Sequence, residues 1–119
     1  MKIHVYSGNF ESEEDAFNFA NEMDYEIEDS IPALWESIGA DRLDEDFIET
    51  IHSTKKIVYL KSLLKDESEI EEIENSCPQE HNTLFLIFSV KDTSNESFEP
   101  KKSKQPLYLG SPEANIENT

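Results

Sequence analysis

The chain has 119 residues, a formal net charge of −17, a 36% hydrophobic content and one cysteine, Cys77. This length fits one small domain, and seven Phe, four Tyr and one Trp argue against disorder of the whole chain. A single cysteine excludes an intramolecular disulfide, and a negative field repels phosphate backbones while attracting basic proteins, peptides and cations. We therefore expect no direct binding to nucleic acid.

The first residues predict a strand followed by a helix. Apolar and polar residues alternate in KIHVYSG, residues 2–8, which is typical of a strand. Ser12, with Asp15 three residues later, resembles a capping box and predicts a helix over roughly 13–23. Neither the apolar core of a signal peptide nor an apolar run of about 18 residues is present, so we expect a cytoplasmic protein outside the membrane.

A short second helix and a second strand come next. Leu34, Trp35 and Ile38 form one apolar face that ends at Gly39, and Asp29 or Ser30 is available as the N-cap. The segment DFIETIH, residues 46–52, alternates in the manner of a strand.

The second half predicts two helices and a central strand. LKSLLKD, residues 60–66, has the length of one or two helical turns, and Ser68 with Glu71 predicts the start of a helix that Pro78 stops. TLFLIFSV, residues 83–90, is a continuous apolar run and predicts a strand covered on both faces.

The C-terminal third changes character. Residues 91–106 are polar and slightly basic, which indicates a mobile loop, and LYLG, residues 107–110, adds a short strand. Residues 111–119 contain little to bury and are predicted to be a disordered tail. The order β-α-α-β-α-α-β-β predicts a single small α+β domain over 1–110, with a sheet of about four strands and helices packed on it.

The negative charge is concentrated in one third of the chain. Residues 11–49 contain fifteen acids and one base, Arg42, and so carry −14 of the −17. Tyr25 and Leu43 lie in connections among these acids and are candidates for exposed contacts, whereas Trp35 and Phe47 are expected in the core.

Residues suited to catalysis or metal binding form no recognisable motif. His4, His52 and His81 are scattered, and Cys77 lies on an apolar helix face, so we expect structural roles and no catalytic residue. DRLDED, residues 41–46, offers several oxygen ligands but lacks the alternating ligands and internal glycine of a calcium loop. We expect neither a metal nor a cofactor.

Four segments together resemble a family of bacterial immunity proteins. They are MKIHVYSGNFESEED, DRLDEDFIE, HNTLFLIFSV and PLYLG, and the family belongs to polymorphic and contact-dependent growth-inhibition toxin systems with a YDEDFI-like segment. PALWESIG after the first strand and helix is also similar to barstar, a small acidic inhibitor of a basic nuclease, as an analogy of strategy.

The resemblance implies an inhibitor without turnover of its own. Separately, we expect a monomer, and open sheet edges leave a dimer as the alternative. The partner that the resemblance implies is the C-terminal domain of a cognate toxin, which we expect to be a basic nuclease. The hypothetical toxin-facing residues are Tyr25, Glu28, Asp29, Asp41, Leu43, Asp44, Glu45, Asp46 and Glu49. Alternatively, Asp46 and Glu49 cap or pair with other groups within the fold. If residues 44–49 form a strand, alternate side chains also point to opposite faces of the sheet.

Two other functions remain open from the sequence. An acidic mimic of nucleic acid that regulates host DNA- or RNA-binding proteins would have the same charge pattern. An enzyme would instead need a pocket with carboxylates of shifted pKa.

Overall fold

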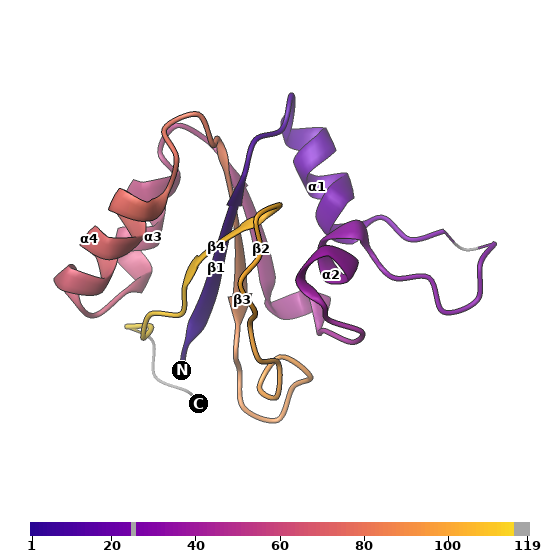
Figure 1. Cartoon of the computed structure of the whole chain (residues 1–119). Coiled ribbons are helices and arrows are strands. Elements are labelled where there is room, and N and C mark those ends of the chain that lie inside the picture. The colour runs from indigo at the N-terminus through magenta and orange to yellow at the C-terminus, as the bar shows by residue number, and fades with distance from the viewer. Residues whose placement is uncertain (25, 116–119) are drawn as a thin grey trace.

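The structure, a computed structural model, describes residues 1–24 and 26–115. Its strands form one antiparallel sheet in the order β2-β3-β1-β4, seen edge-on in Figure 1. The inner strands are β1 (Ile3–Gly8) and β3 (Thr83–Phe88), and the outer strands are β2 (Ile48–His52) and β4 (Leu107–Gly110). The small α+β architecture, the order of elements and the central apolar strand are as predicted.

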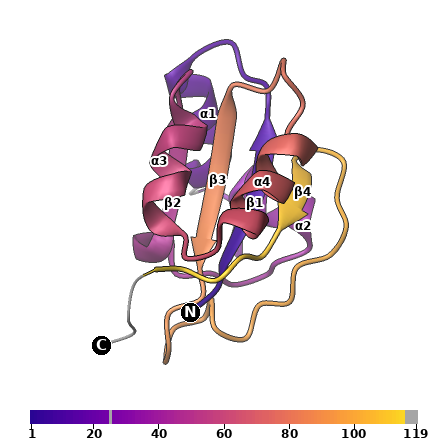
Figure 2. The same cartoon turned by 90° about the vertical axis from the view of Figure 1, so that its left-hand side faces the viewer.

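The helices lie in two layers, one on each face of the sheet (Figure 2). One layer contains α1 (Glu13–Asn21) and α2 (Ala33–Ile38), and the other contains α3 (Lys56–Leu63) and α4 (Glu67–Ser76). A 3-10 turn, η1 (Glu45–Phe47), leads directly into β2. The loop that carries the sequence motif DED is thereby held beside the first layer.

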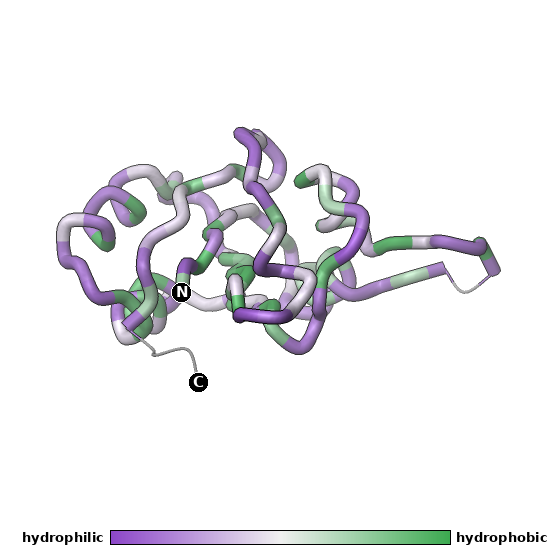
Figure 3. The backbone as a smooth tube through the Cα atoms, turned by 90° about the horizontal axis from the view of Figure 1, so that it is seen from below, coloured by the Kyte–Doolittle hydropathy of each residue, from purple (hydrophilic) through white to green (hydrophobic). Residues whose placement is uncertain are grey.

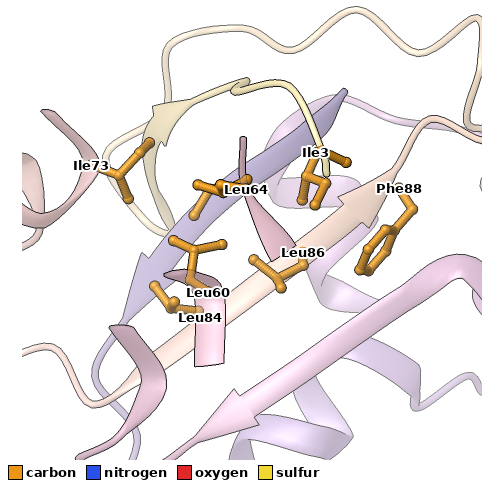
Figure 4. Close-up of a cluster of buried hydrophobic side chains, with 9 residues drawn as sticks. Ile3, Leu60, Leu64, Ile73, Leu84, Leu86 and Phe88 are labelled. Atoms are coloured by element: carbon orange, nitrogen blue, oxygen red, sulfur yellow. The ribbon is translucent and has the colours of Figure 1, made fainter. Parts of the chain in front are cut away.

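The inner strands are buried on both faces, which explains their apolar sequences. Alternate side chains of β3 enter different core clusters, with Leu84 and Leu86 on the α3/α4 side and Phe85 and Ile87 on the α1/α2 side. Figure 4 shows the first cluster, which includes Ile3, Leu60, Leu64, Ile73, Leu84, Leu86 and Phe88.

The helix boundaries confirm some predicted caps and correct others. Ser12 caps α1, because its hydroxyl accepts a hydrogen bond from the Asp15 N–H at 3.0 Å. The N-cap of α2 is Pro32, not Asp29 or Ser30, and it makes no side-chain capping bond.

In the other helix layer, α4 begins earlier than the Ser68 capping box predicted. Its N-cap is Asp66, whose carboxylate accepts hydrogen bonds from both the backbone and the hydroxyl of Ser68. These bonds hold the pKa of Asp66 below its usual value. α3 also begins earlier than expected, at Lys56, because Ile57, one turn before Leu60, packs against the same core cluster.

The C-terminal segments are more firmly attached than the sequence suggested. In the loop 91–106, Asn95 is fully buried, and Phe98 packs edge-on against the His4 ring with centroids 5.5 Å apart. Residues 111–115 are not a free tail, because Pro112 is buried and accepts a hydrogen bond from the Ile3 N–H, and Ala114 belongs to the core. The prediction of a tail with nothing to bury is wrong for these residues, and 116–119 lie outside the described chain.

None of the helices in the described ranges is long and apolar enough to cross a bilayer.

Candidate partner-binding surface

Fourteen carboxylates lie on α1, on α2 and on the segments that connect them with β1 and β2. All are exposed except that of Asp44, which is half-buried. We call this set the acidic face: Glu11, Glu13, Glu14, Asp15, Glu22, Asp24, Glu26, Glu28, Asp29, Glu36, Asp41, Asp44, Glu45 and Asp46.

An arm, residues 22–24 and 26–31, projects from the body between α1 and α2 (Figure 3). The Ser30 hydroxyl accepts a hydrogen bond from the Asp24 N–H at 2.9 Å and so links the two sides of the arm. Asp29 adopts a left-handed φ of 63°, a conformation that Asp tolerates better than most residues. Glu28 and Asp29 are exposed on the arm together with Ile27, whose side chain is 60% exposed. The arm therefore offers one apolar group among carboxylates.

The loop before β2 is fixed by a buried amide that the sequence did not reveal. The Asp44 N–H donates to Asn95 Oδ1 at 2.7 Å, and Asn95 Nδ2 donates to the carbonyls of Asp44 and Phe47 at 3.2 and 3.3 Å. The Asp44 carboxylate also accepts a hydrogen bond from the Asp46 N–H at 3.1 Å. Asn95 thus determines where the carboxylates of this loop lie.

A hollow of about 330 Å³ opens beside this loop. Apolar groups of Met23, Trp35 and Leu43 line it together with three carboxylates and a guanidinium, those of Asp44, Glu45, Asp46 and Arg42. Such a lining suits a lysine or arginine side chain, whose stem packs on apolar groups while its cation meets carboxylates. The Trp35 indole N–H is buried and has no hydrogen-bond partner within the part of the chain that the structure describes.

Two of the predicted contact residues, Leu43 and Glu49, lie elsewhere. Leu43 is only 5% exposed and packs in the core with Phe85, so its predicted exposure is wrong. Glu49 is exposed, but its carboxylate accepts a hydrogen bond from the Tyr59 hydroxyl at 2.7 Å, which places it on the α3 side of the sheet. Tyr25 lies outside the described residues. The structure thus gathers Asp41, Asp44, Glu45 and Asp46 in one loop and holds Glu28 and Asp29 on the arm.

Ion pairs among the described residues do not neutralise the acidic face. Across residues 1–24 and 26–115, the ion pairs join the Met1 amino group to Glu113 and Lys61 to Glu74, and none involves the acidic face or Arg42. Uncompensated like charges destabilise a compact state. A cationic partner would relieve this repulsion.

The three histidines each make one hydrogen bond that joins separate parts of the chain. Their Nδ1 atoms lie 2.7 Å from Ser111 Oγ for His4, 2.9 Å from Thr83 Oγ1 for His52 and 2.8 Å from Ser7 Oγ for His81. Burial, with a smaller contribution from the charge of Lys2, lowers the pKa of His4 to about 4.

The His81 and Ser7 pair borders a hollow of about 410 Å³ that Lys104 also lines. Ser7 itself is fully buried within β1, and no carboxylate in the described chain hydrogen-bonds to His81. A serine nucleophile normally needs an accessible hydroxyl and a base held by a third group. The geometry therefore fits a structural link between β1 and the segment before β3 better than a catalytic pair.

The described residues contain no group of three His, Cys, Asp or Glu side chains placed to hold a metal ion. Comparisons of the chain with protein-family models, with curated proteins and with solved structures find no match.

Proposed function

We propose that this chain is an immunity protein that binds a basic toxin domain through the acidic face and so protects the cytoplasm of the cell that makes it. The observation that supports this most is the uncompensated acidic face, which carries fourteen exposed or half-buried carboxylates without an ion pair in the described chain. Solubility alone requires much less charge than this. This charge lowers the stability of the folded chain, and the binding of a cationic partner would explain why the chain carries it.

A nuclease is the toxin activity that this surface suits best. An enzyme that holds phosphates has a positive active site, and a carboxylate-rich surface can occupy the same site and exclude the substrate. Electrostatic steering raises association rates to about 10⁸–10⁹ M⁻¹s⁻¹ at low salt. Fast capture suits an inhibitor that must act before damage occurs.

The hollow beside Trp35 gives this surface an anchor point. A lysine or arginine of the toxin would place its stem against Trp35 and Met23 and its cation near Asp44, Glu45 and Asp46. Interfaces take most of their binding energy from a few such desolvated anchors. The arm, with Ile27 exposed, would contact a second part of the toxin.

A regulator that mimics nucleic acid is the second candidate, because the same charge would attract many host DNA- or RNA-binding proteins. Breadth of binding separates the two candidates. An immunity protein binds its cognate toxin and ignores other basic proteins, whereas a mimic binds several of them.

The test is to capture partners from the producing cell's lysate with the tagged chain, washing at about 0.1 M and then about 0.5 M salt. We expect one stoichiometric partner, a toxin domain whose activity disappears when an equal amount of the pure chain is added. Several nucleic-acid-binding proteins released together at the higher salt would support the mimic. A captured domain whose activity persists at saturation would contradict inhibition, and an active pure chain in phosphoester or glycoside assays would favour an enzyme.

A further inference from the structure

The outer edge of β2 is open for pairing. β2 is an end strand of the sheet, and its inner edge pairs with β3. The Ser53 N–H donates to the Asn82 carbonyl at 3.1 Å, and ladder bonds of an antiparallel pair alternate along a strand. Glu49 and Ile51 therefore direct their backbone groups to β3, while Thr50 and His52 direct theirs outward. Within the described residues, no backbone hydrogen bond outside the regular ladders and helices involves Thr50 or His52.

Two helices flank this open edge. Figure 2 looks at the face of the sheet that α3 and α4 cover, and it shows α3 in front of the sheet beside β2 and α1 behind it. The hydrogen bond between Tyr59 and Glu49 places the Tyr59 ring beside β2, and this side chain is still 40% exposed. The open edge thus lies between a helix on one face of the sheet and a helix on the other.

The helix α1, on one side of this edge, carries an exposed phenylalanine, Phe17. Phe19 packs on Phe10 and Phe85 and borders Ser37 of α2, so its flank of α1 faces α2. Phe17 lies about 200° away around the helix and so on the opposite flank, toward β2, which α1 contacts. The Phe17 side chain is 58% exposed. Phe47, the last residue of η1 before β2, is 37% exposed, so the expectation that it lies in the core is wrong. Three exposed aromatic side chains therefore lie on the elements that adjoin β2, namely α1, α3 and the turn before the strand.

Charge decides which strand the open edge of β2 can accept. Asp44, Glu45 and Asp46 precede β2, and Glu13 and Glu14 begin α1, the helix on one side of this edge. Lys55 and Lys56 follow β2 at its other end, so acids still outnumber bases near this edge. Two copies of the chain, at −17 each, repel one another, which opposes edge-to-edge pairing of copies.

We propose that β2 accepts an extended lysine- or arginine-rich strand of the partner, which adds to the sheet between Phe17 and Tyr59. Main-chain hydrogen bonds to Thr50 and His52 supply affinity, and the exposed aromatic side chains and nearby carboxylates select apolar and cationic side chains. This mode of binding rests on the function proposed above, because it takes from it the positive charge of the partner.

The probe for this test is a cyclic β-hairpin peptide of alternating lysine and valine, added to the isotope-labelled full chain and followed by NMR. We expect shifts and slowed hydrogen exchange at the Thr50 and His52 amides. N-methylation of the hairpin's pairing edge, or glutamate in place of its lysines, should weaken binding about tenfold or more. Phe17→Ser should weaken it severalfold, whereas Val58→Ser, at a 66% exposed site of α3, should leave it unchanged.

Three results would overturn the proposal. Binding unaffected by N-methylation would mean that side-chain charge alone attracts the peptide, and no shift in β2 at about 1 mM hairpin would mean that the edge is not a docking site. Protection of Thr50 and His52 that grows with protein concentration, without peptide, would identify a second copy as the occupant. Failure here leaves the toxin-inhibition test untouched, since that test measures the whole partner and its activity.

Discussion

The two helix layers pack on opposite faces of the same sheet but differ sharply in charge. Residues 11–49, with α1 and α2, contain fifteen acids and one base, whereas residues 53–82, with α3 and α4, contain seven acids and four lysines. The second layer includes an internal ion pair, Lys61 with Glu74, and the first has none among its described residues. Both layers nevertheless bury a well-packed apolar cluster.

The side chains that hold the fold together are different from the charged side chains on the surface. Apolar side chains of β1 and β3 hold both layers, and burial of that kind is indifferent to the sign of the surface charge. The acidic face is therefore free to vary without loss of fold. The charge difference is the reason that we propose the α1/α2 layer as the side that meets a partner.

The largest expected effect is on the shared core. Phe85→Ala should lower the free energy of unfolding by about 3–5 kcal/mol, because a fully buried ring that contacts Phe10 and Phe19 is lost. Phe17→Ala, at a 58% exposed position of the same layer, should change it by less than about 0.5 kcal/mol. Urea unfolding measures both, and equal effects would contradict the assignment of the core.

Asn95→Ala should have the next largest effect. It leaves backbone groups of Asp44 and Phe47 without partners, and unsatisfied groups of this kind cost about 1–3 kcal/mol. Amide shifts should concentrate in residues 41–47, since this loop loses its anchor. Ser97→Ala, in the same loop but exposed, is the control; an Asn95 variant as stable as this control would show that the amide does not hold the acidic loop.

His4 should make stability depend on pH. Its pKa is about 4 in the folded chain, below the 6.5 of an unfolded histidine, so the neutral ring favours folding. This contribution is complete above pH 6.5 and is lost as the pH falls toward 4. His4→Asn, which can keep a bond to Ser111, should flatten the decline in unfolding free energy between pH 7 and 5 relative to the unchanged chain. Parallel pH profiles of the two proteins would disprove this role.

The smallest effect is expected at Tyr59, on the α3 side. Tyr59→Phe removes the hydrogen bond to Glu49, which lies at the surface, and should cost less than about 1 kcal/mol. The same hydrogen bond, with some burial, raises the pKa of Tyr59 above its usual value. In a spectrophotometric titration, the Glu49→Gln variant should have a Tyr59 pKa closer to the usual value of tyrosine. An unchanged Tyr59 pKa would mean that Glu49 does not bind Tyr59 in solution.

Local patterns predicted much of the fold and less of the surface. The apolar run at 83–90 predicted the central strand because a strand covered on both faces needs apolar side chains on each. Leu43 was misassigned because its neighbours are polar, and only the packing against α2 and β3 decides its burial. Asn95 and the attachment of 111–115 depend on contacts between residues far apart in the chain, which leave no local pattern.

The most direct test of the acidic face is a matched pair of charge reversals. Glu45→Lys with Asp46→Lys changes the acidic face without removing the Asp44 cap, and Glu71→Lys with Glu72→Lys makes the same charge change on exposed positions of α4. We predict that the first pair slows association with the captured toxin domain at low salt by about tenfold or more, and that the second slows it less than about threefold. Equal slowing by the two pairs, or none by the first, would contradict a partner-binding role for this face.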